Sequence, residues 1–470
     1  MANILVVGGG AREHALVWKL AQSETRPRLF AAPGNPGIAA PAECLPIGAE
    51  DVAGIVAAAR EHAIDLVVIG PEAPLMAGLA DTLRAAGVAA FGPGAAAARL
   101  EGSKAFAKDL MARAGIPTAR YAAFDDAAAA RAYVERHGAP VVVKADGLAA
   151  GKGVTVARTV AEALAAVDDA MERGVFGAAG RAVVIEEYLE GDELSMMALV
   201  ASERFVLLPP SQDHKQVYDG DRGPNTGGMG AFAPVPWADE ALLAVVRERI
   251  FAPLLRELSR AGLDYRGVIY AGLMVTREGP QVIEFNARFG DPETQVTLPL
   301  LAGDFAAVCQ AVAEGRLDAA ALRVAPGAAV GVVLASRGYP GAYATGYPIA
   351  GLDALPPGTL AFHAGTRMAD NGTLVTAGGR VLTLVGLGDD LAAARERAYA
   401  AAARMTFAGV HYRRDIGLRE RRITRLTAED AEDAEAERFT TEETEETEAE
   451  QGRSQVTRIR AGGDSLHDGS

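Results

Sequence analysis

Short, mostly apolar segments that end in glycine-containing loops constrain the fold of this chain more than any other feature. Ile4–Val7 is followed by Gly8-Gly9-Gly10, and Asp65–Ile69 is followed by Gly70-Pro71-Glu72. Strands that are apolar on both faces are typical of a parallel sheet that helices cover on either side. An amphipathic pattern over Ala11–Leu20 predicts the first such helix. We therefore expect a doubly wound α/β domain, a fold that binds ligands beyond the carboxyl ends of its strands.

The loop after the first strand has two of the three glycines of a dinucleotide-binding turn. Gly8 and Gly10 fit the pattern Gly-x-Gly-x-x-Gly, but Glu13 stands at the third position. A large acidic side chain there would obstruct close packing and repel a pyrophosphate. We therefore predict that the helix N-terminus binds a small phosphate ester rather than NAD, with a purely structural tight turn as the alternative. In the second loop, Glu72 could accept sugar hydroxyls, begin a helix, or do both.

Length, charge and cysteine content limit the remaining possibilities. The 470 residues suggest about three domains. A formal net charge of −15 argues against sequence-independent nucleic-acid binding, although much of this charge lies within residues 424–470. Cys44 and Cys309 are the only cysteines and lack metal-ligand spacing. Because the chain has no apolar stretch of about 20 residues and no cationic leader, we expect a reduced, cytoplasmic protein without nucleic-acid or membrane partners.

Two lysines lie close to a glycine-rich loop. Pro140–Lys144 has the composition of a strand, and Gly147-Leu148-Ala149-Ala150-Gly151-Lys152-Gly153 follows before a second short strand. Because the loop joins two strands and lacks Gly-x-x-x-x-Gly-Lys-[Ser/Thr], it is not a Walker loop. Its backbone N–H groups, with Lys144 and Lys152, could still cover a polyphosphate. A structural hairpin with surface lysines is the alternative.

Three further stretches are candidates for ligand contacts. Lys104 follows a candidate helix cap, Ser103, and could equally be a solvated helix lysine. The apolar strand Ala182–Ile185 runs into a glutamate-rich hinge whose backbone could pair with adenine, while Glu193 could accept ribose hydroxyls. A glutamate-rich surface turn is the alternative for this hinge. The long polar loop that ends at Gly230 is too rich in glycine to be core, and such loops are usually functional or disordered.

The stretch 281–295 combines a strand with a ligand set suited to a metal. In a regular strand, Glu284 and Asn286 would share one face, while Ile283 and Phe285 would face the core. A carboxylate and an amide two residues apart offer oxygen ligands to a hard cation such as Mg2+. An arginine and a Gly-Asp-Pro-Glu turn follow, and together these groups suggest metal-assisted phosphate chemistry. A half-buried strand with a polar outer face is the alternative.

Taken together, these stretches resemble the phosphoribosylamine–glycine ligase family (glycinamide ribonucleotide synthetases), which are ATP-grasp enzymes of purine biosynthesis. The resemblance covers about Met1 to Gly417 and rests on Gly8–His14, Gly70–Leu75, Leu100–Lys108, Val141–Gly153, Gln212–Lys215, Gly223–Gly230 and Val282–Gln295. It implies that ATP activates the carboxylate of glycine as an acyl phosphate. The amine of 5-phosphoribosylamine would then displace phosphate to give glycinamide ribonucleotide.

The resemblance also implies roles for individual residues. ATP, as co-substrate, would lie between two small sheets and contact Lys104, Lys144, Gly147, Gly151, Lys152, Gly153, Glu186, Glu187, Leu189 and Glu193. The other substrates would contact Gly9, Gly10, Arg12, Glu13, Gly70, Pro71, Glu72, Gly228, Asp291 and Glu293. In catalysis, Asp213, Lys215 and Arg288 would position glycine and the anionic intermediate. Glu284 and Asn286 would bind Mg2+ or Mn2+.

From residues and resemblance together, we expect an α/β protein with four parts. These are a doubly wound parallel-sheet domain at 1–100, an ATP-grasp region of two α+β units at 101–325 with a lid at about 121–190, a small β-rich domain at 326–423, and a disordered acidic tail at 424–470. We expect a monomer. The predicted strand Gly267–Thr276 has no carboxylate, although many ATP-grasp relatives use one there for a second metal, so Glu284 would have to serve both metals.

Two alternatives to this activity use the same residues. Another ATP-grasp ligase, of the biotin carboxylase or carboxyaminoimidazole type, would need a different acceptor loop between Gly8 and Leu75. A non-catalytic nucleotide-binding regulator would have no need of Lys144, Glu284 and Arg288, whose presence counts against it.

Overall fold

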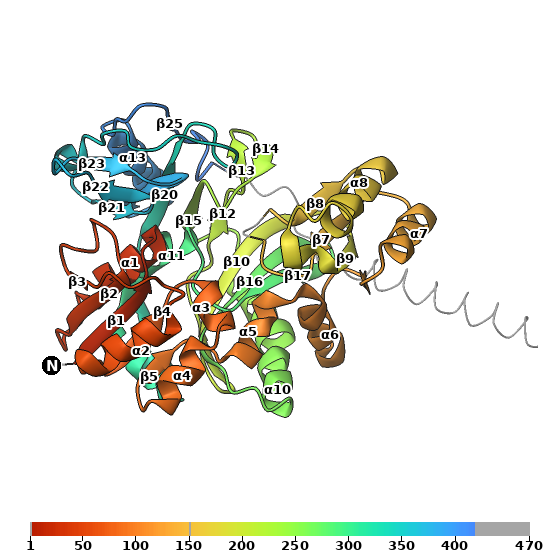
Figure 1. Cartoon of the computed structure of the whole chain (residues 1–470), viewed down its shortest axis with the longest axis horizontal. Helices are drawn as coiled ribbons and strands as arrows, with labels where there is room; N and C mark the ends of the chain where they lie inside the picture. The colour runs from red at the N-terminus through yellow and green to blue at the C-terminus, as the bar shows by residue number, and fades with distance from the viewer. Residues whose placement is uncertain (1, 150–151, 419–470) are drawn as a thin grey trace, which may run out of the picture. The chain divides into compact units, whose positions relative to one another are not determined.

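A five-stranded parallel sheet begins the chain. The computed structural model describes residues 2–149 and 152–418, so Gly151 and the predicted tail at 424–470 lie outside the described residues. The strands follow the order β3-β2-β1-β4-β5 (Figure 1). Because β1 pairs in parallel with both β2 and β4, the loops after β1 and β4 leave the same edge of the sheet. The predicted doubly wound domain is confirmed, with bounds β1 Asn3–Gly8, β2 Arg28–Pro33, β3 Glu43–Cys44, β4 Leu66–Ile69 and β5 Ala89–Phe91.

The helices of this domain pack on the sheet through alternating strand residues. Along β1, Leu5 and Val7 share a buried cluster with residues of α2 (Val52–Glu61) and α4 (Leu79–Ala85). Ile4 and Val6 instead pack with α1 (Ala11–Leu20) in a second cluster. This division follows from the alternation of side chains along a strand. Within the described ranges, no helix has the length and apolar character needed to cross a membrane.

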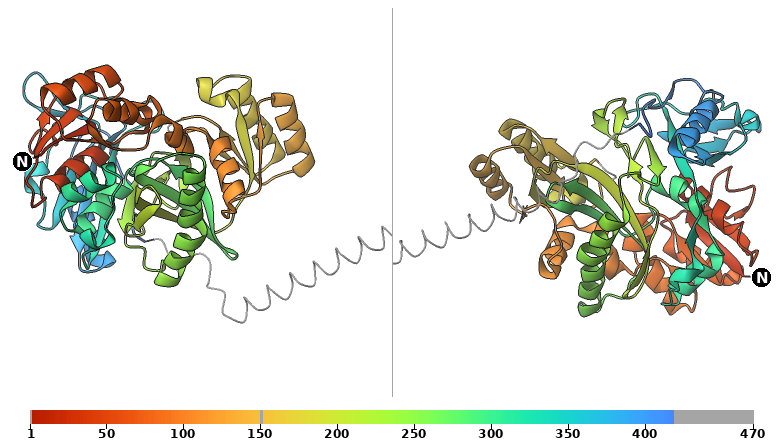
Figure 2. Two further views of the ribbon diagram at one scale, coloured as in Figure 1. Left: turned by 90° about the horizontal axis from the view of Figure 1, so that it is seen from below. Right: turned by 180° about the vertical axis from the view of Figure 1, so that it is seen from behind.

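A second, antiparallel sheet carries the predicted metal strand. Its order is β11-β10-β16-β17, and β16 pairs antiparallel with β17. Both views of Figure 2 show helix α10 (Ala252–Arg260) beside these strands. Its buried residues Leu254, Leu255 and Leu258 belong to the same core cluster as residues of β10 and β16. The bounds are β10 Asp192–Ala201, β11 Arg204–Leu207, β16 Arg266–Thr276 and β17 Gly279–Asn286.

A β-bulge interrupts β17 at the predicted metal ligands. Gly272 pairs with Glu284, and the next residue of β16, Leu273, pairs with Val282 rather than Ile283. A bulge places two residues of one strand opposite one residue of its partner. As a result, Val282 is fully buried while Ile283 is only half-buried. The prediction that Ile283 faces the core together with Phe285 is therefore wrong.

The predicted lid is a four-stranded sheet in the order β6-β9-β7-β8. Strands β7 and β8 pair antiparallel, which confirms that the glycine-rich loop joins two strands. The lid has its own apolar cluster, in which Val134 and Val167 pack with strand residues such as Ile185. The bounds are β6 Tyr121–Phe124, α7 Ala127–His137, β7 Val141–Ala145, β8 Val154–Ala157, α8 Val160–Met171 and β9 Val183–Glu187.

The third large sheet combines strands from two parts of the chain. Its order is β12-β15-β20-β24-β21, with β25 paired to β20, and α13 (Leu391–Ala402) follows β24. Strand β21 pairs with β24, while β22 and β23 form a separate ribbon. The long polar loop that ends at Gly230 runs from β12 to β15, which are both strands of this sheet. The bounds are β12 Gln212–Asp213, β15 Gly230–Ala233, β20 Ala328–Ser336, β21 Thr359–His363, β22 Thr366–Met368, β23 Leu374–Thr376, β24 Arg380–Gly388 and β25 Val410–His411.

The helical segment that contains Pro253 is interrupted. It consists of α9 (Glu240–Val246), one turn of π-helix (Arg247–Phe251) and α10. Proline has no N–H to donate within a helix, and a π-turn is one way in which a helix accommodates such a break. A second helix pair, α5 (Ala95–Gly102) and α6 (Lys104–Ala114), meets at Ser103. The Ser103 hydroxyl caps α6 by accepting the Phe106 N–H at 3.1 Å, as predicted.

Candidate active site

The Glu13 side chain lies between the two glycine-containing loops of the first sheet, which follow β1 at Gly8 and β4 at Gly70. Its Oε2 accepts the Gly10 N–H at 2.7 Å. A Cβ atom added to Gly8 would lie 2.5 Å from Glu13 Cγ, and one added to Gly70 would lie 2.2 Å from Glu13 Oε1. Both glycines are therefore required by the close approach of this side chain. The carboxylate occupies the place where a dinucleotide-binding turn would admit pyrophosphate.

Two other predicted substrate contacts, Arg12 and Glu72, lie close to the Glu13 side chain. The buried Arg12 donates from Nε to Glu13 Oε1 at 2.6 Å and from Nη1 to the Phe289 carbonyl at 3.2 Å. Glu72 begins the short helix α3 (Glu72–Met76), with Pro71 as its N-cap residue. Burial by itself would raise the pKa of Glu72, but Arg288 and Arg12 outweigh it and hold the pKa below its ordinary value. Glu72 is therefore an anion at the edge of the sheet.

Arg288 connects this edge to the metal strand. Its guanidinium lies 3.1 Å from Glu72 Oε2 and 2.9 Å from Glu101 Oε1, and it donates to Asn286 Oδ1 at 3.2 Å. Burial would lower the pKa of Arg288, but Glu101 and Glu72 raise it above its ordinary value. Glu101, at the end of α5, also accepts the Ala287 N–H at 2.8 Å. The sequence does not indicate this role of Glu101, because its proximity to a buried arginine depends on packing between segments distant in sequence.

Glu284 and Asn286 are the residues predicted to bind a metal. Glu284 is half-buried, and its charge acts on the nearby Lys104. Asn286 keeps its carbonyl oxygen next to Arg288. Among residues 2–149 and 152–418, no group of three or more His, Cys, Asp or Glu side chains could hold a metal. A carboxylate and an amide fit Mg2+, which usually takes its other ligands from phosphate and water.

Lysines surround the predicted nucleotide site. Lys144 Nζ lies 2.8 Å from Glu186 Oε1 and donates to the Ile283 carbonyl at 2.9 Å. Lys104 Nζ donates to the Gly147 carbonyl at 3.2 Å, at the start of the glycine-rich loop. Burial lowers the pKa of Lys104, and the nearby Glu284 opposes this effect. At the other end of the described loop, Lys152 is exposed and Gly153 is buried.

The side chains of the predicted adenine hinge are partly committed to other partners. Glu187 Oε2 accepts from Arg120 Nε at 2.7 Å, and the Arg120 N–H donates to Oε1 at 2.9 Å. Burial would raise the pKa of Glu187, but these contacts with Arg120 lower it. Leu189 and Glu193 are both half-buried, and Glu193 lies 3.5 Å from Lys215 Nζ. The Glu187 N–H also donates to the Arg120 carbonyl at 3.0 Å.

A second group of acidic and hydroxyl side chains lies close enough to the metal strand for the charge of Glu284 to act on Lys215 and Tyr270. Lys215 Nζ lies 3.1 Å from Asp213 Oδ1. The buried Glu293 accepts from Tyr270 Oη at 3.1 Å and from Ser195 Oγ at 3.4 Å. Burial, followed by the charge of Asp213, raises the pKa of Glu293 to about 7. Tyr270 and Ser195 had no predicted role, because each belongs to an ordinary apolar strand in the sequence.

Arg380 of β24 brings the C-terminal part of the chain into contact with the site residues. It donates to the Asp291 carbonyl at 2.8 Å, lies 2.9 Å from Asp291 Oδ2, and donates to the Gly227 and Gly228 carbonyls. The other carboxylate oxygen of Asp291 accepts from Gln295 Nε2 at 2.7 Å. Both oxygens of the predicted substrate ligand Asp291 are thus occupied by protein donors. Nothing in the sequence around Arg380 indicates these contacts.

Comparison with known protein families agrees with this arrangement. Three family models match consecutive parts of the chain: the phosphoribosylglycinamide synthetase N domain over residues 2–101, its ATP-grasp (A) domain over 102–294, and its C domain over 329–419. The chain belongs to the phosphoribosylglycinamide synthetase family. The family's N domain carries Glu13, its ATP-grasp domain carries Glu284 and Arg288, and its C domain carries Arg380.

Individual relatives cover nearly all of the matched region. The phosphoribosylamine–glycine ligase of Rhizobium meliloti is 50% identical over 417 residues, which are 89% of this chain and 98% of that protein. The crystal structure of the Thermotoga maritima phosphoribosylamine–glycine ligase is similar with a TM-score of 0.78 at 35% identity, covering 88% of this chain and all of that one. The biotin carboxylase domain of Hydrogenobacter thermophilus 2-oxoglutarate carboxylase shares the fold, with a TM-score of 0.67 at 18% identity over 87% of this chain and 91% of that one.

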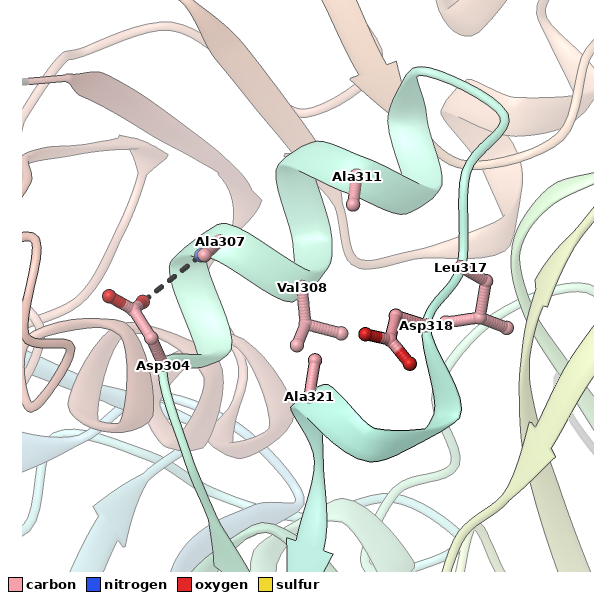
Figure 3. Close-up of a pocket in the computed structure, with 7 residues that line it drawn as sticks. All are labelled: Asp304, Ala307, Val308, Ala311, Leu317, Asp318 and Ala321. Carbon is pink, nitrogen blue, oxygen red and sulfur yellow. Dashed lines mark hydrogen bonds between the residues drawn. The ribbon is translucent and has the colours of Figure 1, made fainter.

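A small pocket lies away from these residues. It has a volume of about 130 Å³ and lies between α12 (Phe305–Ala313) and the segment 317–321 (Figure 3). Its two carboxylates act as helix caps: Asp304 accepts the Ala307 N–H at 3.0 Å, and Asp318 accepts the Ala320 N–H at 2.9 Å. None of the predicted site residues lines it, so the pocket has no part in the function proposed below.

Proposed function

We propose that this chain ligates glycine to 5-phosphoribosylamine with ATP, giving glycinamide ribonucleotide, ADP and phosphate in purine biosynthesis. The observation that carries the proposal is the position of Arg288, which joins the strand of Glu284 to the acceptor loop of Glu72. One guanidinium thus connects the site for phosphoryl transfer to the site for the second substrate. The near full-length similarity to proteins named phosphoribosylamine–glycine ligase supports the same assignment.

In the first proposed step, a carboxylate oxygen of glycine attacks the γ-phosphorus of ATP. The bond from that phosphorus to the β,γ-bridging oxygen breaks, and ADP leaves with the electron pair. Phosphoryl transfer depends mainly on positioning and on neutralising charge. Lys104 and Lys144 would supply positive charge at the phosphates, and Arg288 would do so at the transferred group. Mg2+ or Mn2+, held by Glu284 and Asn286, would neutralise further charge on the phosphates.

In the second step, the amine of 5-phosphoribosylamine attacks the acyl carbon of glycyl phosphate. The carbon–nitrogen bond forms, the bond from carbon to the phosphate oxygen breaks, phosphate leaves with the electron pair, and the amine gives up one proton. We propose that Glu13 and Glu72 accept ribose hydroxyls, with Gly9, Gly10, Arg12, Gly70 and Pro71 completing the site. Asp213, Lys215 and Glu293 would hold glycine, whose ammonium group suits acidic partners.

The acyl phosphate also has to be kept from water. We propose that the loop between β7 and β8 covers the phosphates. Gly147 and Gly153 suit this role because both approach other backbone and side-chain atoms closely. A Cβ atom at Gly147 would lie 2.8 Å from Ala179, and one at Gly153 would lie 2.7 Å from Ala149 Cβ. The hinge residues Glu186, Glu187 and Leu189 would hold adenine through their main chain, and Glu193 would accept ribose hydroxyls.

The proposal includes the domain bounds, the oligomeric state and the cellular setting of the enzyme. We propose domains at 1–100, 101–325 and 326–423, a lid at about 121–190, and a monomeric enzyme. Cys44 and Cys309 are free thiols in the structure, which supports our proposal of a reducing, cytoplasmic setting.

A phosphate-release assay tests the proposed function. We expect purified protein with Mg2+ and ATP to release phosphate only when both glycine and 5-phosphoribosylamine are present. The control replaces glycine with bicarbonate, the substrate class of the biotin carboxylase alternative. Equal turnover with bicarbonate would refute the assignment in favour of that alternative, and no turnover with any substrate pair would favour a non-catalytic regulator.

A further inference from the structure

Two buried lysines share one carboxylate beneath the proposed nucleotide site. Lys108 Nζ lies 2.9 Å from Glu186 Oε2, and Lys144 Nζ lies 2.8 Å from Glu186 Oε1. The three side chains are at most 5% exposed. A buried charge is stable only when it is paired and hydrogen-bonded. The cluster therefore carries one net positive charge, from two ammonium groups and one carboxylate.

Lys108 has no donor left for a ligand. Besides its ion pair with Glu186, it donates to Thr118 Oγ1 at 2.7 Å and to the Ala119 carbonyl at 3.4 Å. An ammonium group has three N–H donors, and these three partners account for all of them. The Thr118 hydroxyl in turn donates to the Val282 carbonyl of β17 at 2.6 Å. Lys108 of α6 is thus held by Glu186 and by the segment Thr118–Ala119, which is in turn bonded to the metal strand.

Lys144 is bound less completely. It donates to the Ile283 carbonyl, which lies at the bulge of β17. Its approach to Glu186 Oε1 is close, yet that oxygen accepts no hydrogen bond of good geometry within the described part of the chain. Lys144 therefore keeps donor capacity for a phosphate oxygen, whereas Lys108 does not.

Charge balance explains why both lysines are present. If Lys108 were absent, Glu186 and Lys144 would form a neutral pair in a poorly hydrated site. The carboxylate would then draw the Lys144 ammonium toward itself and cancel its field at the nucleotide. Burial lowers the pKa of Lys108 to about 8 against the effect of Glu186, so the ammonium remains mainly protonated near neutral pH.

We propose that Lys108 is a positioning residue of the nucleotide site: by holding one oxygen of Glu186, it leaves the positive charge of Lys144 available to the polyphosphate of ATP. The inference rests on the proposed function, because it requires that Lys144 contacts ATP. It assigns to Lys108 an indirect role, exerted through Glu186, rather than a contact with substrate.

The first test is Lys108→Met, which keeps the length of the side chain and removes its charge. We expect the Kd for MgATP, measured by isothermal titration calorimetry, to rise about tenfold, equivalent to about 1.4 kcal/mol. The KM for glycine should stay within about twofold of wild type, because Lys108 lies on the nucleotide side. A fall in kcat with an unchanged Kd for MgATP would overturn the proposal.

The decisive test is the double variant Lys108→Met/Glu186→Gln. Removing both charges restores one net positive charge and frees Lys144 from its carboxylate. We therefore expect MgATP affinity to recover to within about threefold of wild type. A purely structural role for Lys108 predicts the opposite, since a second buried substitution would add to the damage. If Lys108→Met does not fold, the double variant compared directly with wild type decides: a tenfold loss of affinity would overturn the proposal.

Two controls separate this inference from the proposed function. Lys19→Met removes another buried lysine, which donates to the Leu301 carbonyl far from the nucleotide residues, and should leave the Kd for MgATP unchanged. Lys144→Met should weaken MgATP binding by itself. If Lys144→Met has no effect, the proposed nucleotide site is wrong. If Lys144→Met weakens binding but the double variant does not recover, only the role of Lys108 is refuted.

Discussion

Acid should destabilise this protein through His14, a buried histidine of α1. The ring is 9% exposed and packs edge-on against Phe362 at 5.5 Å between centroids. Its Nδ1 accepts the main-chain N–H of His363 at 2.9 Å, so this nitrogen cannot take up a proton without losing the bond. Burial, followed by the charge of His363, lowers the pKa of His14 from 6.5 to about 3.

The size and sign of the effect follow from the two pKa values. Between pH 3 and pH 6.5, the unfolded chain binds a proton at His14 and the folded chain does not. Stability therefore rises with pH across this window and is lost as the pH falls through it. At pH 5, which is 1.5 units below the unfolded pKa, the loss from His14 is about 2 kcal/mol. This value depends little on the folded pKa as long as that pKa stays well below 5.

Urea unfolding at pH 8 and pH 5, followed by circular dichroism, measures the effect. In His14→Asn, an amide oxygen can replace Nδ1 as the acceptor, and no group titrates. We expect the loss of stability between the two pH values to be about 2 kcal/mol smaller in this variant than in wild type. His137→Asn, at an exposed position of the lid, is the matched control and should behave as wild type. An equal loss in wild type and His14→Asn would show that His14 titrates normally in the folded protein.

Three further variants test the proposed site. Glu284→Gln should reduce phosphate release at least about 100-fold at saturating Mg2+ with an unchanged urea midpoint; activity that survives would refute the metal assignment. Arg380→Lys should lower kcat/KM for glycine about tenfold, because an ammonium cannot reproduce the forked contacts that hold Asp291, a predicted substrate contact; unchanged kinetics would show that these contacts do not support the substrate site. Gly70→Ala should raise the KM for 5-phosphoribosylamine about tenfold, equivalent to about 1.4 kcal/mol, because the new Cβ would displace Glu13. MgATP binding should not change. An unchanged KM would show that 5-phosphoribosylamine binds elsewhere.

Several features could be predicted from the sequence because they depend on local patterns. The apolar runs at Ile4–Val7 and Leu66–Ile69 indicated parallel strands, and Ser103 indicated the start of α6. Consecutive apolar residues mark the strands, and the cap joins Ser103 to the N–H of a residue only three positions later.

The bulge at Ile283 could not be predicted from the same kind of pattern. Strict alternation along β17 placed Ile283 in the core, yet pairing with Gly272 and Leu273 of β16 displaced it. A bulge is a property of two strands in register, and one strand's composition does not report it. The bulge matters for the site, because the Ile283 carbonyl next to it accepts from Lys144.

By itself, the sequence determined which chemical groups are available and which local elements present them: glycine turns at strand ends, lysines beside a glycine-rich loop, and a carboxylate and an amide on one strand. Only the tertiary structure decided how these charges are shared. It divides Glu186 between Lys108 and Lys144, and commits Asp291 to Arg380. Ion pairs form between atoms about 3 to 4 Å apart, and packing between distant segments, rather than spacing along the chain, sets those distances.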